Sequence, residues 1–98
     1  MHNEPRYLLA HSAMPGTLLE AIDRMKIADS LLHTLDIIEQ VAWEDHLNGA
    51  EGRAKAFAIC ALVYGDLSDS DHDALDKHIR ERVAARRKWL QEQFKNPA

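Results

Sequence analysis

The stretch that decides the fold is Ala54-Lys55-Ala56-Phe57-Ala58-Ile59-Cys60-Ala61-Leu62-Val63-Tyr64. After Lys55 this stretch is apolar nearly all round, which is typical of a helix that is covered on every side. Its alanines allow neighbouring helices to approach closely, while Phe57 and Leu62 fill the remaining space. We therefore expect a buried central helix over about 51–64, and we expect Gly65 to end it.

The segment before this stretch has the pattern of one long amphipathic helix. Pro15-Gly16 breaks the chain, and Thr17 with Glu20 has the spacing of a capping box. Apolar residues then recur at intervals of three and four, with no glycine or proline before Asn48-Gly49. We expect a helix over about 17–47 that ends at Asn48-Gly49, and a bend or break near 29–30 stays open.

The segments at the two ends complete the predicted fold. Ser68 or Ser70 is a suitable N-cap for a long last helix over about 69–94, before Asn96-Pro97 stops it. Residues 1–16 are expected to form an N-terminal arm, in which Tyr7-Leu8-Leu9-Ala10 is too short to distinguish a strand from a packed arm. The prediction is an all-α fold, a small three-helix bundle in a single domain of residues 1–98.

Composition restricts the class of protein. The chain has 98 residues, 46% of them apolar and 29% charged, which is typical of one globular domain. Its one cysteine, Cys60, has no second cysteine to pair with, so nothing requires an oxidising compartment. The first residues are polar, and the longest apolar run is much shorter than a membrane span. We expect a cytoplasmic protein that does not enter membranes.

The charges are unevenly distributed along the chain. Residues 1–76 carry five basic and fourteen acidic residues, whereas residues 77–98 carry seven basic and two acidic ones, giving a net charge of −4. A nucleic-acid-binding regulator that uses the basic helix 77–95 is therefore an alternative function. The order of acids first and bases last also follows the helix dipole, and the overall acidity repels nucleic acid, so we do not expect this binding.

The predicted helix lengths indicate a homodimer. Two long amphipathic helices would flank a central helix about half their length, and their apolar stripes would extend beyond what it can cover. The alternative is that the first long helix bends and covers itself. The candidate interface residues are large aromatic side chains and an arginine pair on the last helix, where one chain's bases would meet its partner's acids. They are Trp43, Tyr64, Trp89, Arg86 and Arg87.

A second candidate surface is acidic. Negative side chains that lie outside the basic helix would suit a partner with a basic surface. They are Asp36, Glu39, Glu44, Asp45, Asp69, Asp71 and Asp73. The leading hypothesis is a non-enzymatic protein-protein interaction module, a small regulatory, adaptor or inhibitor protein of bacterial or phage type that acts through a helical or acidic surface.

Signals for chemistry are weak. Residues 69–73 imitate the start of a calcium loop, but Ala74 and Arg80 occupy positions where that loop needs glycine and glutamate. Two helical pairs, Asp29 with His33 and His72 with Asp76, offer two ligands each, so a small-ligand or metal-binding bundle is a further alternative. We predict no catalytic residue, no cofactor and no metal site, and we expect Cys60 to behave as a small hydrophobic residue.

Overall fold

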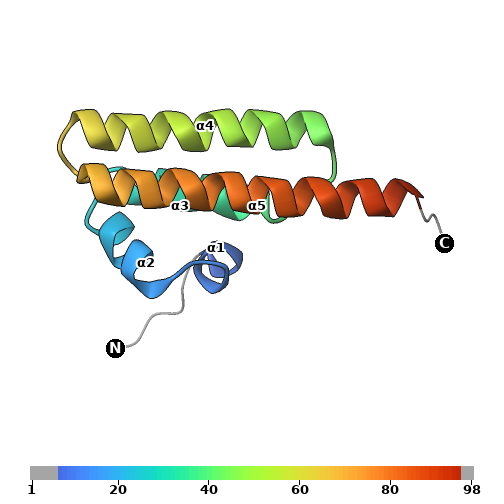
Figure 1. The fold of residues 1–98 in the computed structure, drawn as a ribbon, viewed down its shortest axis with the longest axis horizontal. Coiled ribbons are helices and arrows are strands. Elements are labelled where there is room, and N and C mark those ends of the chain that lie inside the picture. Colours follow the sequence, from blue (N-terminus) through green and yellow to red (C-terminus); the bar gives the residue numbers. More distant parts are fainter. Residues whose placement is uncertain (1–6, 96–98) are drawn as a thin grey trace.

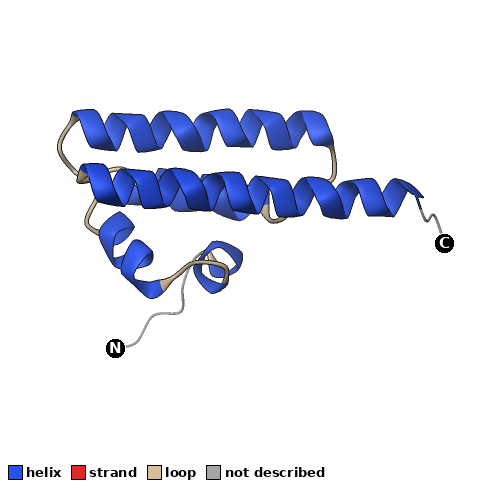
Figure 2. Ribbon diagram, in the orientation of Figure 1, coloured by secondary structure: helices blue, strands red, loops and turns tan. Residues whose placement is uncertain are grey.

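The computed structural model describes residues 7–95, and within them every regular element is an α-helix. Figures 1 and 2 show the helices in order along the chain. They are α1 (Leu8–Ser12), α2 (Gly16–Asp23), α3 (Ala28–Ile38), α4 (Glu44–Val63) and α5 (Asp69–Lys95). The prediction of an all-α helical bundle is therefore confirmed.

Helices α3, α4 and α5 form the body of the molecule. α4 packs against both α5 and α3, and α5 also contacts α3. The two longest helices, α4 with 20 residues and α5 with 27, run side by side as a hairpin (Figure 1). The short helices complete one end, where α1 contacts α3 and α2 contacts α5. α5 extends past the start of α4, so its last turns lie outside the bundle (Figure 1).

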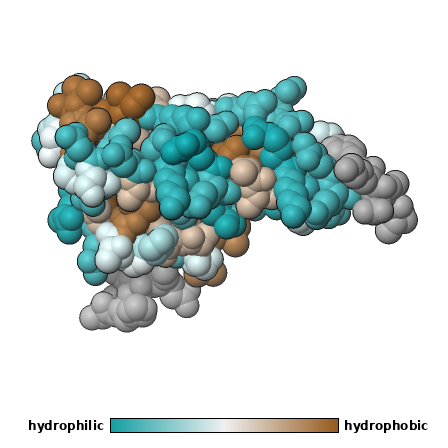
Figure 3. All heavy atoms as spheres, viewed as in Figure 1, coloured by the Kyte–Doolittle hydropathy of each residue, from teal (hydrophilic) through white to brown (hydrophobic). Residues whose placement is uncertain are grey.

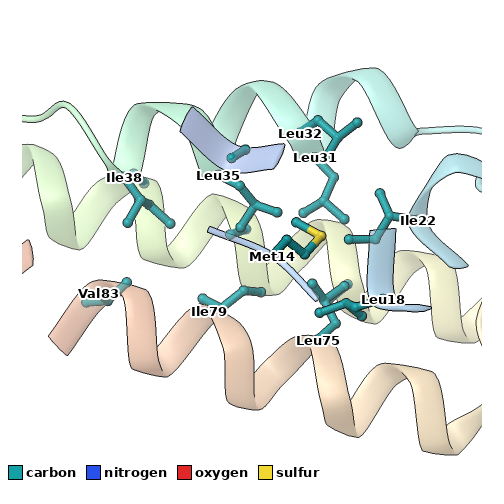
Figure 4. Close-up of a cluster of buried hydrophobic side chains, with 14 of the residues drawn as sticks. Met14, Leu18, Ile22, Leu31, Leu32, Leu35, Ile38, Leu75, Ile79 and Val83 are labelled. Carbon is teal, nitrogen blue, oxygen red and sulfur yellow. The ribbon is translucent and has the colours of Figure 1, made fainter. Parts of the chain in front are cut away.

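The core is built from large side chains on one side and small ones on the other. Branched residues of α3 and α5 converge with α2, as Figure 4 shows for Ile22, Leu31, Leu75 and Ile79, all fully buried. α4 instead contributes an inner line of mostly small buried residues. These are Leu47, Ala50, Ala54, Ala58 and Ala61. The alanines let the α4 backbone approach its neighbours closely, as predicted from the sequence, with the exception of Ala56, which is exposed.

The long helix predicted over 17–47 is wrong. The chain breaks twice, after Asp23 and after Ile38, and the first break lies at residues 24–27 and not at 29–30. The cause is tertiary, because breaking here turns α2 so that Leu18 and Ile22 reach the core and Met25 is buried in the turn itself. The first segment therefore folds back and covers its own apolar stripe, which is the alternative weighed against the dimer.

The predicted helix end at Asn48-Gly49 is also wrong. α4 runs through both residues, because an Asn-Gly pair tolerates a left-handed backbone without requiring one. Gly65, with φ of 81°, does end α4 as predicted. The Asp66 N–H donates to the Ala61 carbonyl at 2.8 Å and the Gly65 N–H to the Leu62 carbonyl at 3.1 Å, which together form a Schellman motif.

The other helix ends give a mixed outcome. Thr17 makes no capping bond, since α2 begins at Gly16 with Pro15 as its N-cap. Ser68 caps α5, its hydroxyl oxygen accepting a hydrogen bond from the Asp71 N–H at 3.0 Å. α5 itself matches the predicted 69–94 helix to within one residue at its end.

The N-terminal arm contains a helix. Residues 8–12 form α1, where Ala10 is buried and its N–H donates to the Asp36 carboxylate at 3.1 Å. Residues 1–6 of the predicted arm lie outside the described residues, as does the end of the chain after Lys95. None of the helices within the described chain combines the length and the apolar composition that crossing a bilayer requires.

Candidate functional site

The outward side of α4 faces solvent but carries no charged side chain along most of its length. At about 100° per residue, six uncharged residues fall on the side opposite the inner line, and all six are exposed. We call them the outer line: Gly49, Gly52, Ala56, Ile59, Cys60 and Val63. Charged residues of α4 lie on its flanks or, as Asp45 does, at its start. A helix face that looks into water is normally polar, and this one is not.

The outer line ends in an apolar patch. Ile59 is 55% exposed, Val63 74% and Tyr64 79%. In Figure 3 hydrophobic spheres gather over this end of α4, whereas most of the surface in view is hydrophilic. Single exposed apolar residues are ordinary, whereas contiguous exposed apolar patches are uncommon on monomeric proteins. Tyr64, predicted as an interface residue, belongs to this patch.

The prediction that the central helix is buried on every side is therefore wrong for the single chain. α3 and α5 both pack on the inner side of α4, and no described element covers the outer side. The helix is nevertheless apolar on all sides, as its sequence pattern indicated. Its outer side is not covered by any other described part of the single chain.

The two glycines of the outer line have no role in the isolated fold. A Cβ at Gly52 would meet nothing within 4 Å, and one at Gly49 would meet only the end of the Arg53 side chain at 4.0 Å. Neither residue has a positive φ. Glycine inside a helix costs roughly 0.5–1 kcal/mol relative to alanine. Alanine at either position would therefore make α4 more stable in the single chain.

A groove lies beside the patch, between the end of α4 and the α2–α3 turn. It encloses about 400 Å³. Its walls are Lys26, Ile27, Phe57, Cys60, Ala61, Tyr64 and Asp66. The Lys26 N–H donates to the Asp66 carboxylate at 3.2 Å and so ties the two turns together at the rim. Cys60 is exposed here and is not the covered hydrophobic residue that the sequence suggested.

The other predicted interface residues lie on α4 and α5. Trp43 is the N-cap of α4 and is 59% exposed. Trp89 on α5 is 44% exposed, and the Arg86 guanidinium carbon lies 4.0 Å from its ring centroid. Arg86 also donates to the Val41 carbonyl at 3.0 Å. Trp43 and Tyr64 thus stand at opposite ends of α4.

Arginines of the basic helix form ion pairs within their own chain. Arg82 donates two hydrogen bonds to Glu39, at 2.8 and 2.6 Å, which joins α5 to the end of α3. This bidentate bond raises the pKa of Arg82 above its usual value. Arg87 donates to Glu44 at 3.0 Å and to the Asn48 side chain at 2.7 Å. The sequence led us to expect base-to-acid pairs between two chains. The structure shows such pairs within one chain.

The predicted acidic surface is divided between the two ends of α4. Asp36, Glu39, Glu44 and Asp45 lie where α3 ends and α4 begins, while Asp69, Asp71 and Asp73 begin α5 at the other end. Glu39 and Glu44 are paired with arginines, and Asp36 accepts from the Gln40 side chain at 2.7 Å. The three acids lie in the first turns of α5, where the positive end of the helix dipole stabilises them. The seven residues do not gather into one surface.

His78 is the one buried histidine of the described residues, at 8% exposure. Burial lowers its pKa below the usual 6.5, and the Arg82 guanidinium lowers that pKa further, against smaller opposite effects of Glu39 and Glu81. The side chain is therefore neutral near pH 7, in the covered layer of α5. It lies away from the outer line.

The residues weighed as pairs of metal ligands contact other neighbours. Asp29 accepts a hydrogen bond from the Tyr7 hydroxyl at 3.0 Å, and the Tyr7 ring meets the His33 ring edge at 5.7 Å. His72 lies 3.6 Å from Asp73. Among residues 7–95, no three His, Cys, Asp or Glu side chains come together in a way that could hold a metal ion.

Comparison with protein-family models, with curated proteins and with solved structures finds no significant match to this chain. The candidate site therefore rests on the outer line, the apolar patch at its end and the adjacent groove. The sequence had singled out Tyr64, which lies in the patch, and Trp43, which lies at the other end of α4, but it had not indicated the outer line. The signal that was present is the low amphipathicity of 49–63, in which both sides of the helix are apolar.

Proposed function

We propose that the protein is a non-enzymatic protein-interaction module that associates through the outer line of α4, and that its partner is a second copy of the same chain. One observation carries the proposal. Over four turns the outward side of α4 presents glycine, alanine and apolar side chains to solvent, ending in Ile59, Val63 and Tyr64. Nothing in the single chain stabilises such a surface.

The outer line is complementary to itself, which favours a second copy as its occupant. Its first half is small, with Gly49 and Gly52, and its second half is large, with Ile59 and Val63. Turned end over end, the large half of one copy fits the small half of the other. The six residues of the outer line carry no charge, so they offer nothing to a partner chosen by charge.

The size of the patch is consistent with reversible association. Covering one large apolar side chain contributes about 1.5–3 kcal/mol, and two copies would cover Ile59, Val63 and Tyr64 twice. The loss of translational and rotational freedom, about 4–15 kcal/mol, offsets much of that gain. We expect a dissociation constant on the order of micromolar.

The test is the molar mass in solution. At tens of micromolar the chain should sediment as a dimer, and Val63→Lys should sediment as a monomer, because it places a charge on the covered line. Ala84→Lys is the matched control, an exposed alanine on α5 away from the outer line, and it should stay dimeric. A wild-type mass equal to one chain under these conditions would overturn the proposal.

The proposal includes a cytoplasmic location. Its support is Cys60, an exposed thiol without a second cysteine in the chain, which suits a reducing compartment. Neither the nucleic-acid nor the metal alternative is favoured by a specific observation. Arg82, Arg86 and Arg87 of the basic helix are engaged within the chain, which leaves them poorly placed for phosphate contacts.

A further inference from the structure

We infer that the two copies pack their α4 helices antiparallel, and that Arg53 of each copy reaches the groove of the other and pairs there with the partner subunit's Asp66. This inference rests on the proposed self-association. It adds a direction, a register and an ion pair that neither copy can make alone.

Arg53 and Asp66 are opposite charges without an ionic partner among the described residues. Arg53 is exposed, and the Asp66 carboxylate accepts the Lys26 backbone N–H at 3.2 Å. Thirteen positions of the chain separate the two residues, about 20 Å if measured along a helix. Within one copy this distance is too long for the Arg53 side chain, so the two charges can meet only between copies.

Arg53 belongs to the stripe of α4 that forms one wall of the groove. Phe57, Cys60 and Tyr64 line the groove and follow Arg53 at intervals of four, three and four residues. These four side chains therefore lie along one flank of the outer line. The two-fold axis of an antiparallel pair places this flank against the same flank of the partner. The start of the stripe in one copy, at Arg53, thus faces its end in the other copy, at the groove.

The side chains of the outer line favour the antiparallel direction. Asp45 lies on the same side of α4, one turn before Gly49. In a parallel pair the two Asp45 carboxylates would face each other, which costs free energy. The two Gly52 residues would also face each other and leave a gap, while the two Val63 side chains would compete for the same space. An antiparallel pair avoids all three contacts.

The spacing of the outer line sets the register. From residue 45 to residue 63 its members alternate at intervals of four and three, which is the seam of a two-stranded coiled coil. We place Gly52 opposite the partner subunit's Val63 and Ala56 opposite the partner subunit's Ile59, so that each large residue meets a small one. Asp45 then falls beyond the end of the partner's α4 and stays in water. A shift by one heptad would bury Asp45 against the partner subunit's Val63, which the cost of burying a carboxylate excludes.

This register brings the Arg53 guanidinium to the rim of the partner's groove. A Cβ at Gly49 would lie 4.0 Å from Nη1 of Arg53, so the side chain runs back along α4 toward residue 49. Residue 49 falls level with the partner subunit's Asp66. The guanidinium donates to that carboxylate, and its flat face covers the exposed ring of the partner subunit's Tyr64.

The direction and register are tested by disulfide cross-linking in a Cys60→Ser background. With Gly52→Cys and Val63→Cys together, mild oxidation should give a covalent dimer whose peptides link position 52 of one chain to position 63 of the other. Val63→Cys alone is the control and should give no covalent dimer. Links of 52 to 52 and 63 to 63 would overturn the antiparallel direction, and a dimer without 52–63 links would overturn the register.

The ion pair is tested by reversing its charges and measuring the dimer dissociation constant by sedimentation. Arg53→Glu should raise that constant about tenfold, because two attractive contacts per dimer become repulsive. Arg53→Glu combined with Asp66→Arg should restore it to within about threefold of wild type. Lys88→Glu makes the same change in net charge at an exposed position of α5 without an ion pair and should leave it unchanged.

A third variant separates the charge of Asp66 from its structural hydrogen bond. Asp66→Asn keeps an oxygen that can accept the Lys26 N–H, and we expect it to raise the dissociation constant severalfold without changing the unfolding of the monomer. A dimer with 52–63 links whose affinity is unchanged in Arg53→Glu, or not restored by the double exchange, would refute the ion pair alone. A monomeric wild type would refute the proposed function itself.

Discussion

The inner and outer lines of α4 are made of similar residues in opposite surroundings. Ala54, Ala58 and Ala61 on the inner line are at most 1% exposed, whereas Ala56 and Cys60 on the outer line are exposed. Both lines are uncharged and rich in small residues, which suit close helix packing. The sequence of a helix determines what its faces can pack against, whereas the rest of the chain decides which face is covered.

The largest contrast is expected from placing a charge on each line. Ala54→Asp buries a carboxylate without a partner and should lower the free energy of unfolding by more than about 3 kcal/mol. Ala56→Asp, only two residues away, should change the stability of the single chain by less than about 0.5 kcal/mol while abolishing the dimer. Urea unfolding under monomeric conditions, together with sedimentation, measures both. Equal destabilisation by the two variants would show that the outer line is covered within the chain.

A smaller loss of stability is expected from breaking the ion pair between Glu39 and Arg82, which joins the end of α3 to α5. Glu39→Gln removes the charge that holds the Arg82 guanidinium and should destabilise the fold by about 1–3 kcal/mol. The same change at the exposed Glu92 of α5 is the control and should stay within about 0.5 kcal/mol. Thermal unfolding measures the difference. A silent Glu39→Gln would mean that packing alone joins α3 to α5.

The buried histidine makes stability depend on pH. Because the folded pKa of His78 is depressed, the unfolded chain binds a proton below about pH 6.5 that the folded chain does not. Stability contributed by neutral His78 is therefore present above that pH and is lost as the pH falls, by at most about 1.4 kcal/mol per pH unit. Unfolding of His78→Gln should show a smaller change than wild type between about pH 7.5 and 5.5. An unchanged pH slope would contradict this assignment.

The smallest change in the free energy of unfolding is expected from exchanging glycine and alanine on the two lines. Gly52→Ala should stabilise the single chain by roughly 0.5–1 kcal/mol, because the added Cβ meets open space in a helix interior. The opposite exchange on the inner line, Ala50→Gly, should destabilise it by more, because it also removes a buried methyl group worth about 0.8 kcal/mol. Chemical unfolding under monomeric conditions detects both changes. Destabilisation by Gly52→Ala would indicate that the space outside Gly52 is filled.

The sequence predicted those features that depend on local chemistry. Gly65 and Ser68 act through their own backbone and hydroxyl groups, so the end of α4 and the start of α5 were placed correctly. The breaks after Asp23 and Ile38 have no glycine or proline, because burial of residues such as Met25 sets them, and burial depends on distant helices. Gly49 is the converse, a residue typical of helix ends that is held inside α4 by the packing of Leu47 and Ala50.

The candidate site was predictable only in composition. The apolar character of both sides of 51–64 was visible, as were Tyr64 and Trp43 as large aromatic residues. Which side lies open depends on α3 and α5 packing on the same side of α4, and no local pattern encodes that arrangement. The pairing of Arg82 and Arg87 with acids of their own chain was hidden for the same reason, since these partners lie more than forty positions apart.

The tight turn at Gly65 also bears on how the protein folds. It joins α4 and α5 into a helical hairpin whose contacts begin between close neighbours in the chain, and such local contacts form early. We expect amide protons of the hairpin to exchange most slowly and those of α1 and α2 to exchange first. The outer line lies wholly on the hairpin. Loss of the amino-terminal helices, by partial unfolding or proteolysis, would therefore leave the outer line in place.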